Sequence, residues 1–377
     1  MNEVCFWYSD EQNSLDARSK KHPASFRNVD TFAEDPALIA FTSGTTGKPK
    51  GTVHFHRDVI AMCDCFPRSC LRPVPEDIFI GSPPLAFTFG LGGLLCFPLR
   101  FGASTVLVEK FTPETLLEAV RKFRATVLFT APTMYRALAG LWGRYALSSL
   151  RKCVSAGEAL PDATRQLFKQ ASGIEIIDGI GSTEMIHIFI SHAPEHARRG
   201  ATGQAIPGYT AVVLDEKGER CAPGQIGRLA VQGPTGCRYL ADERQKSYVQ
   251  NGWNLTGDAY VMDMDGWFIY QARTDDMIIS AGYNIAGPEV EDALLSHPAV
   301  AECGVVGAAD ETRGMIVRAF VVLKKDFSAS DEMKKELQEH VKRNIAPYKY
   351  PRAVEFVDAL PRTETGKLQR FKLRTQP

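Results

Sequence analysis

The sequence of 377 residues lacks an excess of charge of either sign, because 44 Lys and Arg residues balance 44 Asp and Glu residues. Composition therefore offers no electrostatic attraction to nucleic acid or to an acidic membrane. No uninterrupted apolar run is long enough for a bilayer, since the longest apolar stretch, residues 83 to 99, contains glycines and is followed by Arg100. We expect a packed helix there and no membrane span. The first residues carry Glu3, Asp10 and Glu11 and do not resemble a secretory leader.

Cysteine spacing typical of metal sites is also absent. The nine cysteines are scattered and odd in number, which favours a reducing, cytoplasmic environment over a disulfide framework. His54 and His56 stand two apart in a segment, 54 to 66, that is predicted to be helical. Side chains at that spacing do not converge on a helix, so we predict no metal site there.

One stretch, TSGTTGKPKG at residues 42 to 51, is rich in groups that bind phosphate. Its glycines let backbone N–H groups close on an anion, and its hydroxyls and lysines add donors and charge. The preceding run ALIAF, residues 37 to 41, predicts a buried strand, so we expect the loop to leave a sheet edge. It is not a Walker A loop, because Pro49 follows Lys48 where that motif requires Ser or Thr. The alternative is a solvated turn.

Five further motifs follow in order: SAGEAL (155 to 160), DGIGSTE (178 to 184), TGD (256 to 258), RTDDMIISAGYNI (273 to 285) and PRTETGK (361 to 367). Together with the loop they resemble the adenylate-forming superfamily, which includes acyl-CoA synthetases, luciferases and the adenylation domains of peptide synthetases. The agreement in order, from residue 42 to residue 367, makes the resemblance specific and disfavours the solvated turn. It implies an enzyme that uses ATP, Mg²⁺ and coenzyme A.

The resemblance also implies roles for single residues. Glu184 would hold Mg²⁺ and Thr183 would contact phosphate. Lys367 would stabilise the charge that grows in the transition state. The ATP- and AMP-binding set is Thr42, Ser43, Gly44, Thr45, Thr46, Gly47, Lys50, Gly157, Glu158, Asp178, Gly179, Ile180, Thr183, Asp258 and Arg273. The alternatives are a surface carboxylate for Glu184, a turn cap for Asp258 and a solvated tail lysine for Lys367.

Two reactions at one site are implied. A carboxylate attacks the α-phosphate of ATP to give acyl-AMP and pyrophosphate, and the CoA thiol then displaces AMP. The resemblance implies that the small domain rotates about Asp275 between the two steps, presenting Lys367 first and the loop 280 to 283 second. Gly282 in that loop would let pantetheine pass close to the backbone.

Two segments would form the acid pocket, residues 82 to 93 and 179 to 189. They offer flat, apolar walls suited to an aromatic ring. The strings GIGSTEMIHIF and GTVHFHRD resemble benzoate-CoA and 2-aminobenzoate-CoA ligases, so an acid of the benzoate type is predicted. His187 either contacts a ring substituent or is a core histidine with its hydrogen bonds satisfied. The predicted pocket residues are Ala86, Phe87, Phe89, Gly179, Ile180 and His187.

Other functions share these motifs. A short- or medium-chain acyl-CoA synthetase would carry all of them. An adenylation domain that loads a carrier protein is a second alternative, although no carrier-like segment follows residue 367. A nucleotide-binding remnant without turnover is a third. The oligomeric state is left open.

Short apolar strands alternate with amphipathic helices up to about residue 179, which predicts a largely parallel α/β sheet. Closely spaced glycines and alternating strands predict a small β subdomain over about 200 to 270. We predict three regions: a polar, linker-like segment (1 to 35), a large domain (36 to 272) and a mobile α+β C-terminal domain (273 to 377). In the resembling family about a small domain's length of chain precedes the loop. Here 41 residues do, so we expect an N-terminally shortened chain.

Overall fold

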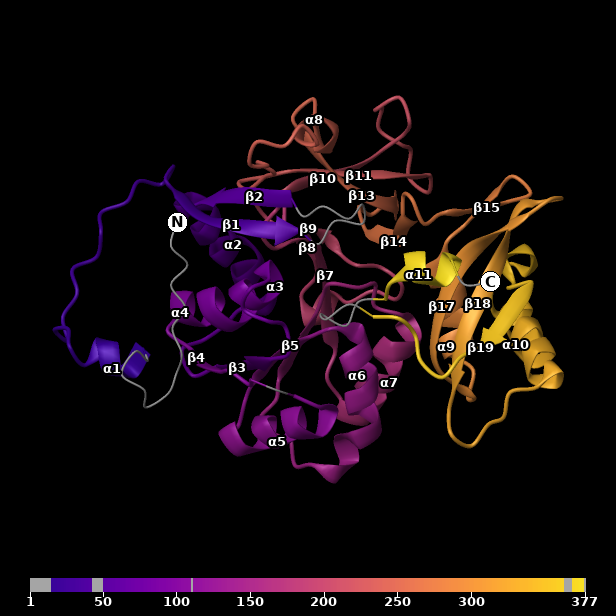
Figure 1. Ribbon diagram of the computed structural model, residues 1–377, viewed down its shortest axis with the longest axis horizontal. Coiled ribbons are helices and arrows are strands. Elements are labelled where there is room, and N and C mark those ends of the chain that lie inside the picture. Colours follow the sequence, from indigo (N-terminus) through magenta and orange to yellow (C-terminus); the bar gives the residue numbers. More distant parts are fainter. Residues whose placement is uncertain (1–14, 43–49, 110, 363–367, 376–377) are drawn as a thin grey trace.

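The computed structural model describes residues 15–42, 50–109, 111–362 and 368–375 (Figure 1). The chain has a mixed α/β fold with a large N-terminal domain and a small C-terminal domain, as the sequence predicts. The small domain lies at one end of the long axis of the molecule (Figure 1). The bounds of 36–272 and 273–377 for the two domains stay a prediction.

A seven-stranded sheet with the order β4-β3-β5-β6-β7-β8-β9 forms the centre of the large domain. The strands β4, β3, β5, β6 and β7 run parallel, whereas β8 and β9 extend the sheet in antiparallel pairings. The largely parallel sheet is therefore confirmed. The strands are β3 (Ile78–Gly81), β4 (Ser104–Val106), β5 (Val127–Thr130), β6 (Lys152–Ser155), β7 (Ile176–Gly181), β8 (Ile188–Ser191) and β9 (Gln204–Ala205).

The two faces of this sheet bury two different cores, because side chains alternate along each strand. Ile80 and Leu128 pack on one face against α5 (Pro113–Phe123), α6 (Pro132–Leu141) and α7 (Asp162–Ser172). Their neighbours Phe79 and Phe129 face the other way, toward α2 (His56–Phe66) and the β subdomain. The helix α6 was not among the predicted elements.

Local sequence explains where these helices begin and end. The Thr112 hydroxyl caps α5 by accepting a hydrogen bond from the amide of Thr115 (3.3 Å), and Pro113 fits the first turn because it has no N–H to satisfy. Helix α7 ends at Gly173, whose φ of +75° places it in the left-handed region that glycine adopts without strain. The predicted cap at Thr112 is confirmed.

The segment before the phosphate-binding motif differs from its prediction. Strand β1 (Pro36–Thr42) pairs with β2 (Lys50–Phe55) in a separate two-stranded antiparallel hairpin. Within β1 only Ala40 is buried, and Phe41 is 64 % exposed, so the prediction of a buried strand was wrong. A run of five apolar residues does not distinguish a strand of a buried sheet from a strand of a separate two-stranded hairpin.

Two helix predictions also need correction. His54 lies on β2, and the helix α2 begins at His56. The single packed helix expected over residues 83 to 99 is instead a broken one: α3 (Thr88–Leu91), a π-helical turn η2 (Gly92–Cys96) and α4 (Phe97–Phe101). In the described parts of the chain, no helix combines the length and apolar character needed to cross a bilayer.

The predicted β subdomain is present as an antiparallel sheet with the order β10-β11-β13-β12, in which β14 also pairs with β13. Its inner residues, such as Val213 and Leu229, join the core that α2 and Phe79 share. The strands are β10 (Thr210–Leu214), β11 (Ile226–Gln232), β12 (Val249–Gln250), β13 (Trp253–Met262) and β14 (Phe268–Arg273), with the short helix α8 (Gln245–Tyr248) before β12.

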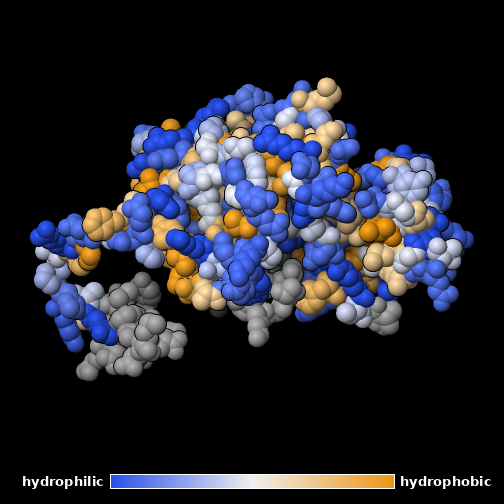
Figure 2. Space-filling view, turned by 90° about the horizontal axis from the view of Figure 1, so that it is seen from above, coloured by the Kyte–Doolittle hydropathy of each residue, from blue (hydrophilic) through white to orange (hydrophobic). Residues whose placement is uncertain are grey.

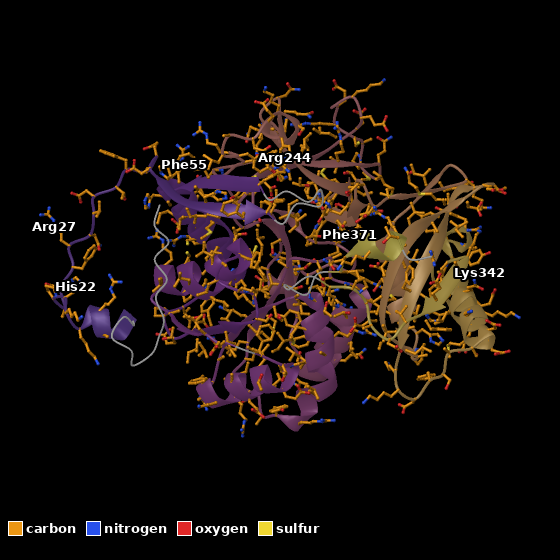
Figure 3. All side chains as sticks on the ribbon, in the orientation of Figure 1. His22, Arg27, Phe55, Arg244, Lys342 and Phe371 are labelled. Carbon is orange, nitrogen blue, oxygen red and sulfur yellow. The ribbon has the colours of Figure 1, made fainter. Side chains whose placement is uncertain are left out.

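The small domain has its own sheet and its own core, which Val305, Val317 and Leu337 help to form. Its strands are β15 (Ile278–Ser280), β16 (Tyr283–Ile285), β17 (Val300–Asp310), β18 (Gly314–Leu323) and β19 (Ala353–Phe356), and its helices are α9 (Gly287–Leu295), α10 (Asp331–Asn344) and α11 (Arg370–Arg374). Figure 3 labels Phe371, on α11, where the small domain faces the large one.

Shorter elements complete the described chain: α1 (Leu15–Ser19), η1 (Pro67–Leu71), η3 (Trp142–Arg144), η4 (Pro194–His196) and η5 (Pro347–Lys349). Residues 20–35 contain no helix or strand and extend along the outside of the molecule (Figures 1 and 2). Three apolar side chains of this segment, those of Phe26, Val29 and Phe32, are 77 to 83 % exposed. The linker-like segment over residues 1–35 stays a prediction, and residues 1–14 lie outside the described part.

Candidate active site

Lys50, the first residue of β2, meets Glu184 and Tyr239 where the hairpin loop ends. The Tyr239 hydroxyl donates a hydrogen bond to Oε1 of Glu184 (2.5 Å) and accepts one from Nζ of Lys50 (2.6 Å). Nζ of Lys50 also lies 3.5 Å from Oε1 of Glu184. Because Glu184 and Tyr239 are buried and Lys50 is half-buried, these contacts offset the cost of removing the charges from water.

Thr183 and Glu184 lie in the connection between β7 and β8, and β2 holds this connection in place. The wholly buried His54 of β2 donates from Nε2 to the carbonyl oxygen of Thr183 (2.8 Å). The same carbonyl accepts the amide of Ile186 (3.2 Å). The strand that carries Lys50 therefore also fixes the backbone of the two residues predicted to contact phosphate and metal.

Ile186 has a φ of +65°, which is a strained conformation for a β-branched residue and costs about 1–2 kcal/mol. It stands between Glu184, which contacts Lys50 and Tyr239, and His187, which contacts aromatic rings. The strained turn lets Glu184 contact charged and polar groups while His187, three residues later, contacts aromatic rings. No signal in the sequence predicts this backbone conformation.

Asp258 on β13 and Arg273 on β14 form an ion pair. Nη1 of Arg273 donates to Oδ1 of Asp258 (3.0 Å) and to the carbonyl of Thr256 (3.0 Å). Burial raises the pKa of Asp258, and the charge of Glu184 raises it further, while Arg273 opposes both effects. The carboxylates of Asp258 and Glu184 are therefore close enough to repel each other. Gly257 (φ +78°) allows the close approach, since a Cβ there would lie 2.6 Å from Nη2 of Arg273.

Asp178, at the end of the parallel part of β7, is buried and its Oδ1 has no hydrogen-bond partner among the described residues. Burial raises the pKa of this carboxyl to about 8. Its backbone is well held, because the Ser191 hydroxyl donates to its carbonyl (2.6 Å) and Nε2 of His192 accepts its amide (3.2 Å). An orphaned carboxyl oxygen at the predicted adenine segment is suited to a ligand with N–H groups.

Glu158, the other acidic residue of the predicted adenine segments, contacts the C-terminal tail. Its Oε1 accepts the amide of Leu368 (3.3 Å) and lies 3.7 Å from Nη1 of Arg362, while Oε2 accepts the Thr133 hydroxyl (2.9 Å). Arg362 and Leu368, which lie on either side of residues 363–367, thus hold the small domain against the predicted adenine segment. Gly157 has a φ of +91°, Gly179 is buried against Ile188, and Ile180 is half-buried.

His187 is enclosed by three phenylalanine rings, those of Phe66, Phe89 and Phe97, at centroid distances of 5.9, 5.8 and 4.6 Å. It is 3 % exposed, and neither ring nitrogen has a hydrogen-bond partner among the described residues. Burial lowers the pKa of His187 to about 3, so the ring is neutral. A neutral imidazole with two open nitrogens in an aromatic cage differs from a core histidine whose hydrogen bonds are satisfied.

Two other predicted pocket residues lie nearer the surface. Phe87 is 42 % exposed and Ala86 is exposed, on the turn before α3. Gly92, which was not singled out, faces the histidine ring directly: a Cβ there would lie 2.4 Å from Cδ2 of His187. The glycine is needed for close approach at this position.

Several predicted residues lie outside the described residues. They are Ser43, Gly44, Thr45, Thr46, Gly47 and the predicted catalytic Lys367. Thr42 ends β1 at the edge of this gap.

Two predicted residues of the small domain are described. Asp275, the predicted hinge residue, lies between β14 and β15, with a side chain 57 % exposed. Gly282, the predicted CoA residue, occupies the β15–β16 turn with a φ of +80° next to Ala281 at +49°. The turn itself therefore requires a glycine there.

Sequence reasoning missed Tyr239 and His54 as site residues. Tyr239 lies outside the six motifs, and His54 was considered only as a metal ligand. In the described residues no group of three or more His, Cys, Asp or Glu side chains is placed to hold a metal ion.

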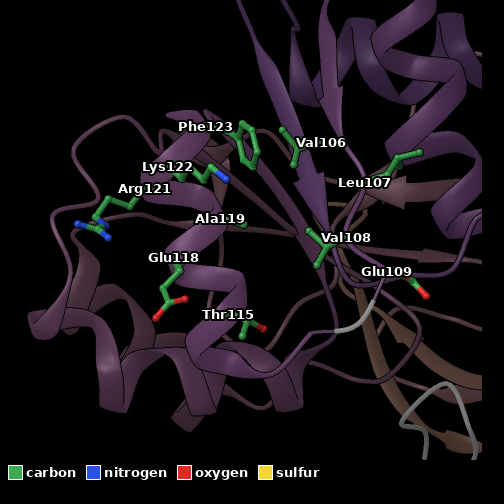
Figure 4. A pocket seen from close by; sticks show the side chains of 10 residues that line it. All are labelled: Val106, Leu107, Val108, Glu109, Thr115, Glu118, Ala119, Arg121, Lys122 and Phe123. Atoms are coloured by element: carbon green, nitrogen blue, oxygen red, sulfur yellow. The ribbon is translucent and has the colours of Figure 1, made fainter.

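A surface pocket elsewhere on the large domain does not contain these residues. It lies between the end of β4 and the helix α5 and is lined by residues 106–109, 115, 118, 119 and 121–123 (Figure 4). Since β4 is the outer strand of the seven-stranded sheet and β7 lies toward the opposite edge, this pocket is separate from the candidate active site.

The chain resembles known proteins over most of its length. The family model described as AMP-binding enzyme matches residues 4–239, and the model of the AMP-binding enzyme C-terminal domain matches residues 289–367. The benzoate-CoA ligase of Thauera aromatica is 38% identical over 370 residues, which is 97% of this chain and 70% of that protein. The mitochondrial acyl-coenzyme A synthetase ACSM3 of Mus musculus is 37% identical over 92% of this chain and 62% of its own length.

Among solved structures, that of an anthranilate CoA ligase in complex with anthranoyl-AMP is similar, with a TM-score of 0.91 and 38% identity. The match covers 94% of this chain and 70% of that one. Because it extends over both domains, it includes the docked position of the small domain.

Proposed function

The chain belongs to the AMP-binding enzyme family, and on that premise we propose that it is an ATP-dependent aryl-acid CoA ligase. It joins a carboxylic acid of the benzoate type to ATP, releasing pyrophosphate, and then transfers the acyl group from AMP to the thiol of coenzyme A. A carboxylate is a poor acylating agent, so the first step supplies the leaving group for the second.

The observation that carries the aryl assignment is the cage around His187. Flat rings line it, and its polar atoms are limited to two ring nitrogens without partners among the described residues. An aromatic acid bound against these rings would gain ring contacts worth about 0.5–1.5 kcal/mol each beyond the area they bury. The relatives named benzoate-CoA ligase and anthranilate CoA ligase support the same class of substrate.

The charged end of the candidate site, which contains Lys50, Glu184, Tyr239, Asp258 and Arg273, would bind the nucleotide. Lys50 and Thr183 would meet the phosphates, Asp258 would accept the ribose hydroxyls, and Asp178 with Glu158 would border adenine. Glu184 would hold Mg²⁺, which when bound neutralises charge on the phosphates. Lys367 would reach the α-phosphate; its neighbour Leu368 lies at Glu158, which supports that position.

A second candidate is a short- or medium-chain acyl-CoA synthetase, which the similarity to ACSM3 favours. The two candidates share every nucleotide contact and differ only in the acid. For both we propose a cytoplasmic location, because all eight cysteines in the described residues are free.

The test is ATP-dependent CoA-thioester formation with benzoate, 2-aminobenzoate, butyrate and hexanoate, and Glu184→Gln as the background control. We expect kcat/KM for the aryl acids to exceed that for the aliphatic acids by about tenfold or more, since each methylene-sized misfit costs about 1–3 kcal/mol. A preference for hexanoate would favour the second candidate. A thermal shift with AMP but no thioester from any acid would refute both and leave a nucleotide-binding remnant.

A further inference from the structure

Tyr239 has no role in either of the two proposed reaction steps, although it contacts two residues that do. Its hydroxyl stands between an ammonium and a carboxylate, 2.6 Å from Nζ of Lys50 and 2.5 Å from Oε1 of Glu184. A phenol can accept one hydrogen bond and donate another at the same oxygen, which neither of its two partners can do. Lys50 therefore reaches Glu184 mainly through Tyr239.

The fold holds the tyrosine firmly at this point. Residues 238–240 run beside β2, with the amide of Val53 donating to the carbonyl of Arg238 and the amide of Leu240 donating to that of Gly51, both at 2.8 Å. Tyr239 is thereby paired with Thr52, two residues beyond Lys50 and on the same face of the strand.

A glutamine fixes the same segment from the other side. Oε1 of Gln245 accepts the amide of Tyr239 (2.7 Å), and Nε2 of Gln245 donates to the carbonyl of Cys237 (3.0 Å). The Tyr239 ring packs edge-on against Tyr248 at 5.7 Å. The hydroxyl is thus positioned by backbone pairing, a side-chain clamp and ring packing together.

The carboxylate of Glu184 is left with one engaged oxygen. Within residues 15–42, 50–109, 111–362 and 368–375, the contacts to Lys50 and Tyr239 both fall on Oε1. The Tyr239 hydroxyl donates its proton to Oε1 of Glu184. Oε2 takes part in neither contact, so it is the oxygen left for a cation, in an orientation that the tyrosine sets.

We propose that Tyr239 is a positioning residue that orients Glu184 for a divalent cation and keeps Lys50 from approaching that carboxylate more closely than the 3.5 Å observed. The inference rests on the proposed function, because it assigns the cation to Mg²⁺ bound with ATP. Without the hydroxyl, Lys50 collapses onto Glu184, which neutralises the metal-binding carboxylate and withdraws the ammonium from the phosphates.

The test is a calorimetric titration of ATP into the whole chain over a series of Mg²⁺ concentrations, with Tyr239→Phe as the variant. We expect the Mg²⁺ concentration for half-maximal enhancement of ATP binding to rise about tenfold, as for other partners that orient a metal ligand. AMP binding without Mg²⁺ should change less than twofold. Tyr248→Phe is the matched control, because its hydroxyl contacts Ser182 (3.4 Å) and not Glu184, and it should keep the wild-type dependence.

A double-mutant cycle separates this role from a structural one. In a Glu184→Gln background, Tyr239→Phe should have no further effect on the Mg²⁺ dependence, because the hydroxyl acts through the carboxylate. An unchanged dependence in Tyr239→Phe, or an equal loss in both backgrounds, would overturn the inference alone. If the wild type binds ATP without any Mg²⁺ dependence, the proposed function fails with it. Should Tyr239→Phe not fold, Gln245→Ala must shift the dependence in the same direction, and a wild-type dependence there would refute the role.

Discussion

The charged end and the apolar end of the candidate site are held by different kinds of contact, although Glu184 in one and His187 in the other are only three residues apart in the chain. At the charged end Lys50, Tyr239 and Glu184 are linked by hydrogen bonds, and Asp258 is paired with Arg273. At the apolar end His187 is surrounded by rings and has no hydrogen-bond partner among the described residues. Under the proposed function, the difference means that the charged end serves any acid, whereas the apolar end selects one. Changes at the charged end should therefore lower activity equally for all acids.

The largest effect is expected from Lys367→Ala. Pyrophosphate exchange should fall about 10²–10³-fold with every acid, as when one group that stabilises transition-state charge is removed. Thioester formation from supplied benzoyl-AMP and CoA should be spared, because that step does not need charge at the α-phosphate. Both half-reactions are measured on the same preparation. Equal loss of the two would show that the lysine does not belong to the first step alone.

Gly92→Ala should disturb the apolar end only. A Cβ there would lie 2.4 Å from Cδ2 of His187, so the ring must move or the fold must strain, at a cost of about 1–3 kcal/mol in the free energy of unfolding. We expect KM for benzoate to rise about tenfold while KM for ATP stays unchanged. Gly140→Ala on α6 is the control, since nothing lies within 4 Å of a Cβ there. A matching rise in both KM values would contradict the separation of the two ends.

His187→Ala distinguishes the two roles predicted for this histidine. If an open ring nitrogen contacts the amino group of 2-aminobenzoate, that acid loses the energy of one hydrogen bond, about 0.5–1.5 kcal/mol, in addition to what benzoate loses. Calorimetry should then show a loss of affinity for 2-aminobenzoate that is about threefold to tenfold larger than the loss for benzoate. Equal losses for the two acids would mean that His187 only fills space.

The last prediction concerns pH, where Asp178 and His187 should change the stability with opposite signs. Burial raises the pKa of Asp178 to about 8 from 3.8, so the native state keeps a proton that the unfolded chain releases, and stability falls as pH rises between these values. Burial lowers the pKa of His187 from 6.5 to about 3, so stability rises with pH in that range.

Between pH 3.8 and 6.5 the two contributions cancel in the wild type. Asp178→Asn should therefore reveal the rise and His187→Asn the fall, each at most about 1.4 kcal/mol per pH unit. The measurement is the thermal midpoint of each variant minus that of the wild type, followed against pH. Difference profiles with the same sign of slope would show that these groups are not buried as described.

Sequence predicted the parallel sheet, the β subdomain and the small domain because each has a local period that packing preserves. The capped helix beginning at Pro113, whose buried residues face one core, and the strand 127–130, which is buried on both faces, are examples. It failed at the hairpin β1–β2, because a short apolar run carries no information about which strand will be its neighbour. Six predicted site residues, including Lys367, lie outside the described residues.

Within the candidate site, sequence motifs brought attention to Glu184, Asp258 and His187 but not to Tyr239. A motif marks residues that are close along the chain, whereas Tyr239 reaches Glu184 only because residues 238–240 pair with β2. The positive φ of Ile186 was equally hidden, since isoleucine has no preference for the left-handed region. Long-range pairing and backbone strain have to be seen in the structure.

The most direct test of the two-ended site is a crystal structure of this chain with a benzoyl-AMP analogue. We predict the phosphate beside Lys50 and Thr183, the ribose hydroxyls on Asp258, and the aromatic ring against Phe89 and His187. A nucleotide bound away from Glu184 and Asp258, or a ring directed away from His187, would contradict the account.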